Sequence, residues 1–161
     1  MLSRRLPRWI ERVASVGALP SDTDEERLRK ATLILAPILV IPLAVIWVVT
    51  YGALGLALSA AIPFVYQAVS GISLVFFART RRYRFFRFSQ LLLMLLLPFL
   101  LQLSLGGFVA SSGVILWGLT SPLGALMFSG RRQAVRWLLA FLVLLALSAM
   151  LEPRIPDASI P

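Results

Sequence analysis

The chain contains no cysteine and no histidine among its 161 residues. Their absence removes thiolate nucleophiles, imidazole bases, and the usual zinc and haem ligands. Acidic residues are also scarce, and none lies between Glu26 and Glu152. There is no carboxylate pair, no glycine-rich phosphate loop, and no nucleophile beside a base. We therefore predict that this chain is not an enzyme by itself, with no catalytic residues, no metal ligands and no cofactor.

Apolar residues are abundant instead. The chain is 59% hydrophobic and only 14% charged, and its mean hydropathy is +0.88. A soluble domain is about half apolar and about a quarter charged. So short a chain cannot bury this much apolar surface in a core of its own, whereas a lipid bilayer can cover it. The composition predicts a membrane protein whose main partner is the bilayer.

Five apolar segments have the length of membrane spans, since a helix needs about 20 residues to cross the hydrocarbon core. They cover residues 31–51, 55–78, 89–106, 108–129 and 135–151. We predict an all-α polytopic membrane helix bundle with five transmembrane helices in a domain of residues 31–151. Residues 1–30 form a basic cytoplasmic segment and residues 152–161 an external tail.

The third and fourth segments are separated only by Gly107. As one straight helix, residues 89–129 would be about 60 Å long, twice the thickness of the hydrocarbon core. The chain must therefore fold back, and Gly106-Gly107 suits a tight reversal because glycine tolerates positive φ. A re-entrant loop near Ser111-Ser112-Gly113 is the alternative.

The basic residues predict the orientation. With five crossings, 15 of the 16 basic residues fall on one side and only Arg154 on the other. The positive-inside rule then places the N-terminus in the cytoplasm, for a multi-pass protein of the cell membrane. If residues 89–129 crossed only once, Arg131, Arg132 and Arg136 would lie on the external side. The topology-determining residues of the central loops are Arg79, Arg81, Arg82, Arg84, Arg87, Arg131 and Arg132.

The net charge of +9 raises the question of nucleic acid. In a membrane protein the same excess reflects cytoplasmic loops that face anionic lipid. The arginines of residues 79–87 lie between two apolar segments, which favours the membrane explanation. We expect no nucleic-acid partner.

The N-terminal segment divides in two. Apolar residues at helical spacing over residues 2–16, with arginines between them, predict an amphipathic helix on the cytoplasmic leaflet. A basic tail without such a helix is the alternative. Farther on, Ser21 or Asp22 is the expected N-cap of a helix that runs into the first span.

Several polar and small residues within the spans are candidates for contacts. An amide facing lipid is costly, so Gln67 and Gln102 should form interhelical hydrogen bonds or contact a ligand, and Ser111 and Ser112 are similar candidates. Two groups of small residues predict close packing of helices, within the chain or between copies. They are Ala53, Ala57 and Ala61, and Gly113, Gly118, Gly124 and Ala125. The leucine-rich run of residues 91–105 is expected to face lipid.

Residues Phe86–Pro153 carry a resemblance to a known family. The stretch contains "GGFVASSGVILWGLTSPLGALMF", then a basic turn, then a leucine-rich helix that ends in "LEP". It resembles the N-terminal membrane domain of bacterial class III adenylate/guanylate cyclases. The likeness extends over residues 25–161 and is specific over the third to fifth spans.

The resemblance implies a six-helix membrane domain, followed by a signalling helix and a dimeric cytoplasmic domain that makes cyclic AMP or GMP. This chain stops before the sixth helix and before the catalytic domain, so the family's metal-binding aspartates and base-recognising residues have no positions here. The expected function is membrane anchoring and signal reception for such a cyclase, through helix packing in a homodimer. The alternatives are a sensor module of another signalling protein, such as a histidine kinase, or a stand-alone small transporter or scaffold.

Overall fold

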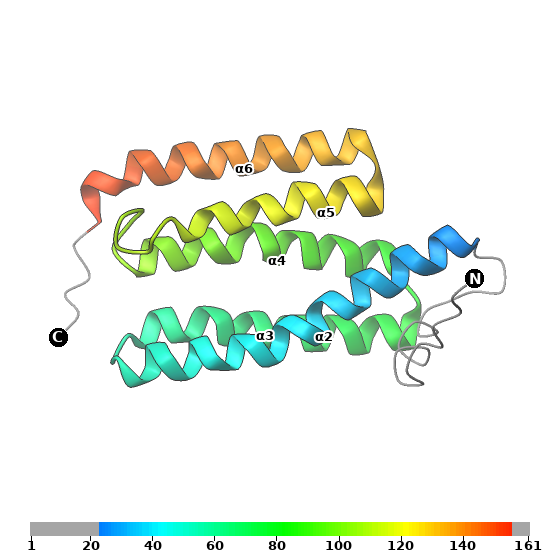
Figure 1. Ribbon diagram of the computed structural model, residues 1–161, viewed down its shortest axis with the longest axis horizontal. Coiled ribbons are helices and arrows are strands. Elements are labelled where there is room, and N and C mark those ends of the chain that lie inside the picture. Colours follow the sequence, from blue (N-terminus) through cyan, green and yellow to red (C-terminus); the bar gives the residue numbers. More distant parts are fainter. Residues whose placement is uncertain (1–22, 156–161) are drawn as a thin grey trace, which may run out of the picture.

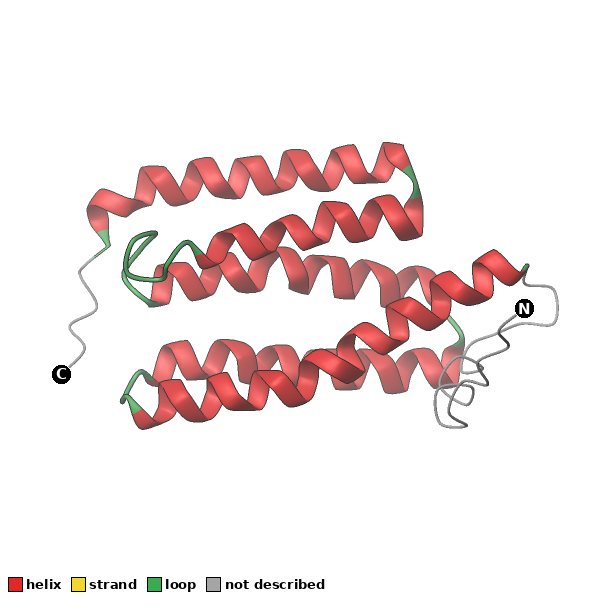
Figure 2. Cartoon of the chain, viewed as in Figure 1, coloured by secondary structure: helices red, strands yellow, loops and turns green. Residues whose placement is uncertain are grey.

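The computed structural model describes residues 23–155, and every regular element in this part of the chain is a helix (Figures 1 and 2). The α-helices are α2 (Asp24–Ala53), α3 (Ala57–Thr80), α4 (Tyr83–Ser104), α5 (Thr120–Ser129) and α6 (Arg131–Leu151). Two 3₁₀ segments, η1 (Val114–Leu119) and η2 (Glu152–Arg154), complete the order. The predicted all-α helix bundle is confirmed. The predicted amphipathic helix of residues 2–16 lies outside the described residues.

Four of these helices, α2, α3, α4 and α6, are long and apolar enough to cross a membrane. Consecutive helices run in opposite directions, with α2 and α3 as one pair and α5 and α6 as another (Figure 1). Helix α4 lies between the two pairs and contacts α2, α3, α5, α6 and η1. The length and hydropathy of the four helices agree with the predicted membrane location.

The central place of α4 contradicts, for part of its leucine-rich run, the prediction that the run faces lipid. Leu91, Leu95 and Leu101 are buried, and among large apolar residues of this run only Leu100 is exposed. Leucine occupies every face of this helix. The sequence therefore does not show which side of α4 contacts other helices and which side faces outward. Neighbouring helices cover one side of α4, and most of the other large apolar residues of the run are partly exposed.

The N-cap of helix α2 lies one residue after Asp22 and two after Ser21, the two predicted N-caps. The N-cap is Thr23, whose hydroxyl accepts a hydrogen bond from the backbone N–H of Glu26 at 3.3 Å. The Glu26 carboxylate accepts the backbone N–H of Thr23 at 3.0 Å in return. This reciprocal capping box satisfies two otherwise unpaired N–H groups. The motif needs a serine or threonine three residues before a glutamate or glutamine, which Thr23 is; Ser21 precedes Asp24 by three residues, and Asp22 has no hydroxyl.

The chain reverses at the predicted place. Gly106 and Gly107 have φ of +95° and +103°, conformations that favour glycine. The segment that follows is not one continuous helix over residues 108–129. A loop extends to Gly113, and the 16 residues of η1 and α5 then run back along α4. Because a 3₁₀ helix rises about 2.0 Å per residue, η1 and α5 together extend about 27 Å, close to the thickness of the hydrocarbon core.

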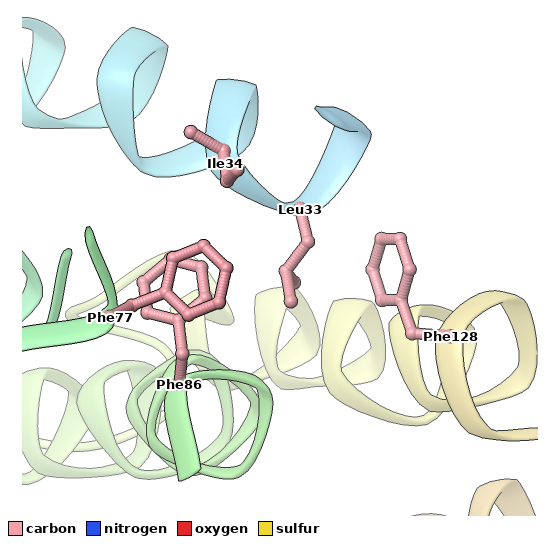
Figure 3. Packing of buried hydrophobic residues seen from close by; sticks show 5 residues of the cluster. All are labelled: Leu33, Ile34, Phe77, Phe86 and Phe128. Atoms are coloured by element: carbon pink, nitrogen blue, oxygen red, sulfur yellow. The ribbon is translucent and has the colours of Figure 1, made fainter. Parts of the chain in front are cut away.

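Two apolar clusters hold the bundle together. The first cluster joins α2, α3, α4 and α5 near the α3–α4 turn (Figure 3). Within it the rings of Phe77 and Phe86 stack with centroids 5.0 Å apart. The second cluster joins α4, η1 and α6 through Leu95, Ile115 and Phe141. The members of the first cluster are Leu33, Ile34, Phe77, Phe86 and Phe128.

The small residues of the fourth segment pack closely, as predicted. A Cβ atom on Gly118 would lie 3.1 Å from Cδ2 of Phe141, and one on Gly124 would lie 3.1 Å from Cδ2 of Leu91. Ala125 is fully buried. The other predicted group, Ala53, Ala57 and Ala61, is exposed and makes no seam within the chain. Ala53 is the last residue of α2, so the α2–α3 turn interrupts the predicted stripe, and Ala57 and Ala61 lie on the exposed face of α3.

Candidate functional site

The buried face of α3 is a seam of small and hydroxyl-bearing residues against α4. The Ser59 hydroxyl donates to the Ser104 hydroxyl at 3.1 Å, and Ser73 and Ser89 share a hydrogen bond of 2.6 Å. Such residues let helices approach closely and bond across the interface within a membrane. The serine hydroxyls of α3 therefore form interhelical hydrogen bonds along this seam. Its buried members recur at intervals of three and four: Ser59, Pro63, Tyr66, Ser70, Ser73 and Phe77.

Gln90 is a polar contact of this seam that was not predicted from the sequence. Gln90 is fully buried in α4, and its Oε1 accepts a long hydrogen bond of 3.4 Å from the Ser70 hydroxyl. Its Nε2 has no hydrogen-bond partner among the described residues. The sequence could have indicated this contact, because Gln90 lies at the start of the third apolar segment. An amide in contact with lipid is as costly there as at Gln67 and Gln102.

The two glutamines predicted as contacts have different environments. Gln67 donates from Nε2 to the backbone oxygen of Ile41 at 3.3 Å, which links α3 to α2. Gln102 is fully buried, donates to the hydroxyl of Ser148 on α6, and accepts the backbone N–H of Ile115 at 3.3 Å. Gln102 thus joins α4, η1 and α6. Both amides serve interhelical hydrogen bonds, one of the two predicted roles.

The predicted Ser111 and Ser112 lie in the loop between α4 and η1 rather than inside a helix. The Ser111 hydroxyl donates to the backbone oxygen of Phe108 at 3.3 Å, and Ser112 has a positive φ of +54°. The structure therefore does not bring them together with Gln102 at one contact site. The same loop is held by Glu152, whose two carboxylate oxygens accept the backbone N–H of Phe108 at 2.7 and 3.0 Å.

The basic residues gather at one end of the bundle. The start of α2, the α3–α4 turn and the α5–α6 turn all lie at this end, called here the basic end (Figure 1). The α2–α3 turn, the α4–η1 loop and η2 lie at the other end, with Arg154. The arginines predicted to determine topology are all at the basic end and exposed, apart from half-buried Arg87. These residues are Arg79, Arg81, Arg82, Arg84, Arg87, Arg131 and Arg132.

Arg87 also has a packing role that charge counting did not predict. Its Nη1 donates to the backbone oxygen of Phe128 at 2.8 Å, in the last turn of α5. Carbonyls in the last turn of a helix lack intrahelical partners, and a cation there is favourable. The Arg87 guanidinium also lies 5.4 Å from the ring centroid of Tyr83, and the Lys30 ammonium lies 5.8 Å from the same centroid. Side chains of α2 and α4 thereby meet at the basic end.

A groove of about 540 Å³ opens between α2 on one side and α4 and η1 on the other, and Pro63 and Tyr66 of α3 also line it. Its lining is largely apolar, and Pro63 and Pro98 contribute to it. The groove lies within helices that have the length and hydropathy of membrane spans. It is the clearest candidate for a binding site in the described part of the chain.

The described residues include no group of three or more His, Cys, Asp or Glu side chains that could hold a metal ion. The polar groups in the interior of the bundle are hydroxyls and amides, which hold helices together and orient them. Comparison of the chain with protein-family models, with curated proteins and with solved structures found no match. The resemblance to cyclase membrane domains therefore stays a prediction.

Proposed function

We propose that this chain is a multi-pass membrane domain that anchors a signalling enzyme in the cell membrane. In this proposal, changes in helix packing pass to a cytoplasmic output domain. One observation supports this proposal: four apolar helices of the bundle are long enough to span a membrane, and the basic turns lie together at one end of it. Under the positive-inside rule the basic end, and with it the N-terminus, faces the cytoplasm.

The proposed output enzyme is an adenylate/guanylate cyclase, supported by the resemblance of Phe86–Pro153. Such an enzyme works as a dimer, so the membrane domain would pair with a second copy. Ala57 and Ala61, which are exposed on α3, support that pairing, because small residues let two membrane helices approach closely. A histidine kinase output would leave the anchoring role unchanged, and the coding sequence beyond Pro161 separates the two.

The experiment compares the full-length gene product with a version whose residues 23–155 are replaced by an unrelated membrane anchor of the same topology. We expect the replacement to change the dimer fraction or the rate of cyclic-nucleotide synthesis while membrane location persists. If dimerisation and cyclase activity were the same in both proteins, the proposed signal-receiving role would be wrong. If the gene encoded no output domain, the choice of partner enzyme would be wrong.

A further inference from the structure

The groove between α2 and α4 extends over only one half of the bundle. On α2 its lining runs from Val40 to Tyr51, and on α4 from Leu93 to Leu101. The first of these stretches rises about 16 Å, and the hydrocarbon core of a bilayer is about 30 Å thick. The groove therefore has the depth of a single leaflet.

The groove is closed toward the basic end. There Leu33 and Ile34 of α2 pack in one cluster with Phe86 of α4 and Phe128 of α5 (Figure 3). Beyond this cluster α2 runs beside α3 and away from α4 (Figure 1). The open half thus belongs to the leaflet at the other end of the bundle.

The depth of the groove and its closed end indicate which kind of molecule can occupy it. Water does not fill an apolar space, because the lining offers it too few hydrogen-bond partners. A transmembrane helix of a partner needs the full thickness of the bilayer, and the packed cluster at the basic end blocks half of it. A hydrocarbon chain of a lipid occupies a single leaflet, and the volume of about 540 Å³ lies in the range of about 300–1,000 Å³ typical of ligand pockets.

Aromatic residues mark the end of the groove that is remote from the basic end. Trp47 and Tyr51 line it near the end of α2, and Trp117 lines it from η1. Tryptophan and tyrosine are enriched where a membrane meets water, with an apolar ring on one side and a polar group on the other. A lipid whose chain enters the groove would have its headgroup at this level.

We propose that the groove binds one acyl chain of a phospholipid from the leaflet opposite the basic end. The bound chain lies between α2 on one side and α4 and η1 on the other, so its presence sets how far α2 lies from α4 while the α3–α4 seam stays in contact. The inference rests on the membrane location proposed above. It assigns a ligand class to that membrane domain, whether or not the output enzyme is a cyclase.

The test uses phosphatidylcholine with a diazirine in the middle of one acyl chain, added to vesicles that contain the full chain. After illumination, labelled peptides are mapped by mass spectrometry. We expect saturable labelling of the groove lining, at about one lipid per chain, that excess unlabelled phosphatidylcholine suppresses. Peptides from the outer face of α6 should show only unsaturable background labelling, as for any lipid-facing helix.

Two substitutions fill the groove from opposite walls, each with a matched control on an exposed face. Met94→Trp fills it from α4, and Met127→Trp adds the same bulk on the exposed face of α5. Ala44→Phe fills it from α2, with Ala68→Phe on the exposed face of α3 as its control. We expect each filling variant to reduce saturable labelling by about fivefold or more, because the added side chain occupies the volume. The controls should leave it unchanged.

The outcomes separate the lipid site from its alternatives. Uniform, unsaturable labelling of all helices, or equal labelling of Met94→Trp and Met127→Trp, would overturn the acyl-chain site and leave the membrane domain intact. Absence of labelling on every helix would overturn the membrane location itself. Because the chain has no cysteine, a single Leu97→Cys reports a protein occupant. Oxidative cross-linking of two copies at this position would assign the groove to a second copy and refute the lipid.

Discussion

At the residue scale, Arg87 combines the charge of the basic end with the packing of the bundle. Its guanidinium donates to the last turn of α5 and lies against Tyr83, while its neighbour Arg84 is exposed. Substituting either residue by alanine removes one positive charge, so the effect on membrane orientation should be similar. Only the Arg87 substitution removes a charge-assisted hydrogen bond.

Arg87→Ala is therefore expected to lower the free energy of unfolding by about 1.5–3 kcal/mol. Arg84→Ala should change it by less than about 0.5 kcal/mol, as is usual for a surface position. The measurement is unfolding in mixed detergent micelles, followed by tryptophan fluorescence. Equal losses in the two variants would show that Arg87 contributes charge alone.

Gly107 is a position where a side chain of any size would be unfavourable. Its φ is +103°, and a Cβ atom there would lie 2.5 Å from Oε1 of Glu152. We expect Gly107→Ala to destabilise the α4–η1 loop both by backbone strain of about 1–3 kcal/mol and by displacing the carboxylate from the Phe108 N–H. In a Glu152→Ala background only the strain remains. A double-mutant cycle on unfolding free energy should therefore show coupling of about 0.5–3 kcal/mol, and additive losses would refute the contact.

At the scale of elements, two leucine-rich helices have opposite surroundings. Leu95 of α4 is 4% exposed and packs with Ile115 and Phe141, while Leu139 of α6 is 57% exposed. Leu95→Trp should overpack the second cluster and cost about 1–3 kcal/mol of unfolding free energy. Leu139→Trp should cost less than about 0.5 kcal/mol, since its side chain points away from the bundle. The same unfolding assay compares the two, and equal stability would place α4 at the periphery.

The helices themselves could be predicted from the sequence because each apolar segment is long and bounded by charge or glycine. The need for a reversal followed from the length of residues 89–129, and its place at Gly106-Gly107 followed from the tolerance of glycine for positive φ. The burial of α4 could not be predicted, because leucine on every face gives no amphipathic signal. The seam of α3 was obscured by an alanine stripe of equal regularity, and only its partners Ser89, Gln90 and Ser104 on α4 identify the serine face as the buried one.

At the scale of the whole molecule, the fold brings the basic turns to one end of the long axis of the bundle. The turn with Arg81, Arg82 and Arg84 and the turn before Arg131 and Arg132 are 50 residues apart in sequence, yet they lie at the same end of the bundle (Figure 1). Sequence reasoning reached this pairing because five crossings alternate the loops between two sides. It could not find the groove, which arises from the divergence of α2 from α4 beyond the cluster of Leu33 and Phe86.

This axis makes the orientation testable with two reporter fusions. Arg84 lies at the basic end and Ile155 at the opposite end, so a reporter after Arg84 should be cytoplasmic and one after Ile155 external. The physical reason is the retention of lysine- and arginine-rich loops on the cytoplasmic side during insertion. Activity of a periplasmic-type phosphatase and fluorescence of a cytoplasmic-type protein measure the two locations.

A charge variant gives this prediction its control. Replacing Arg81, Arg82, Arg84, Arg131 and Arg132 by glutamine keeps the helices apolar and leaves Arg87 to cap α5, but it removes most of the charge from the two turns. We expect a mixed population, with both reporters detectable on both sides. If the variant kept a single orientation, the N-terminal basic segment of residues 1–30 would determine the topology instead. If both reporters on the unaltered chain lay on one side, the crossing formed by η1 and α5 would be wrong, and that segment would have to return without spanning the bilayer.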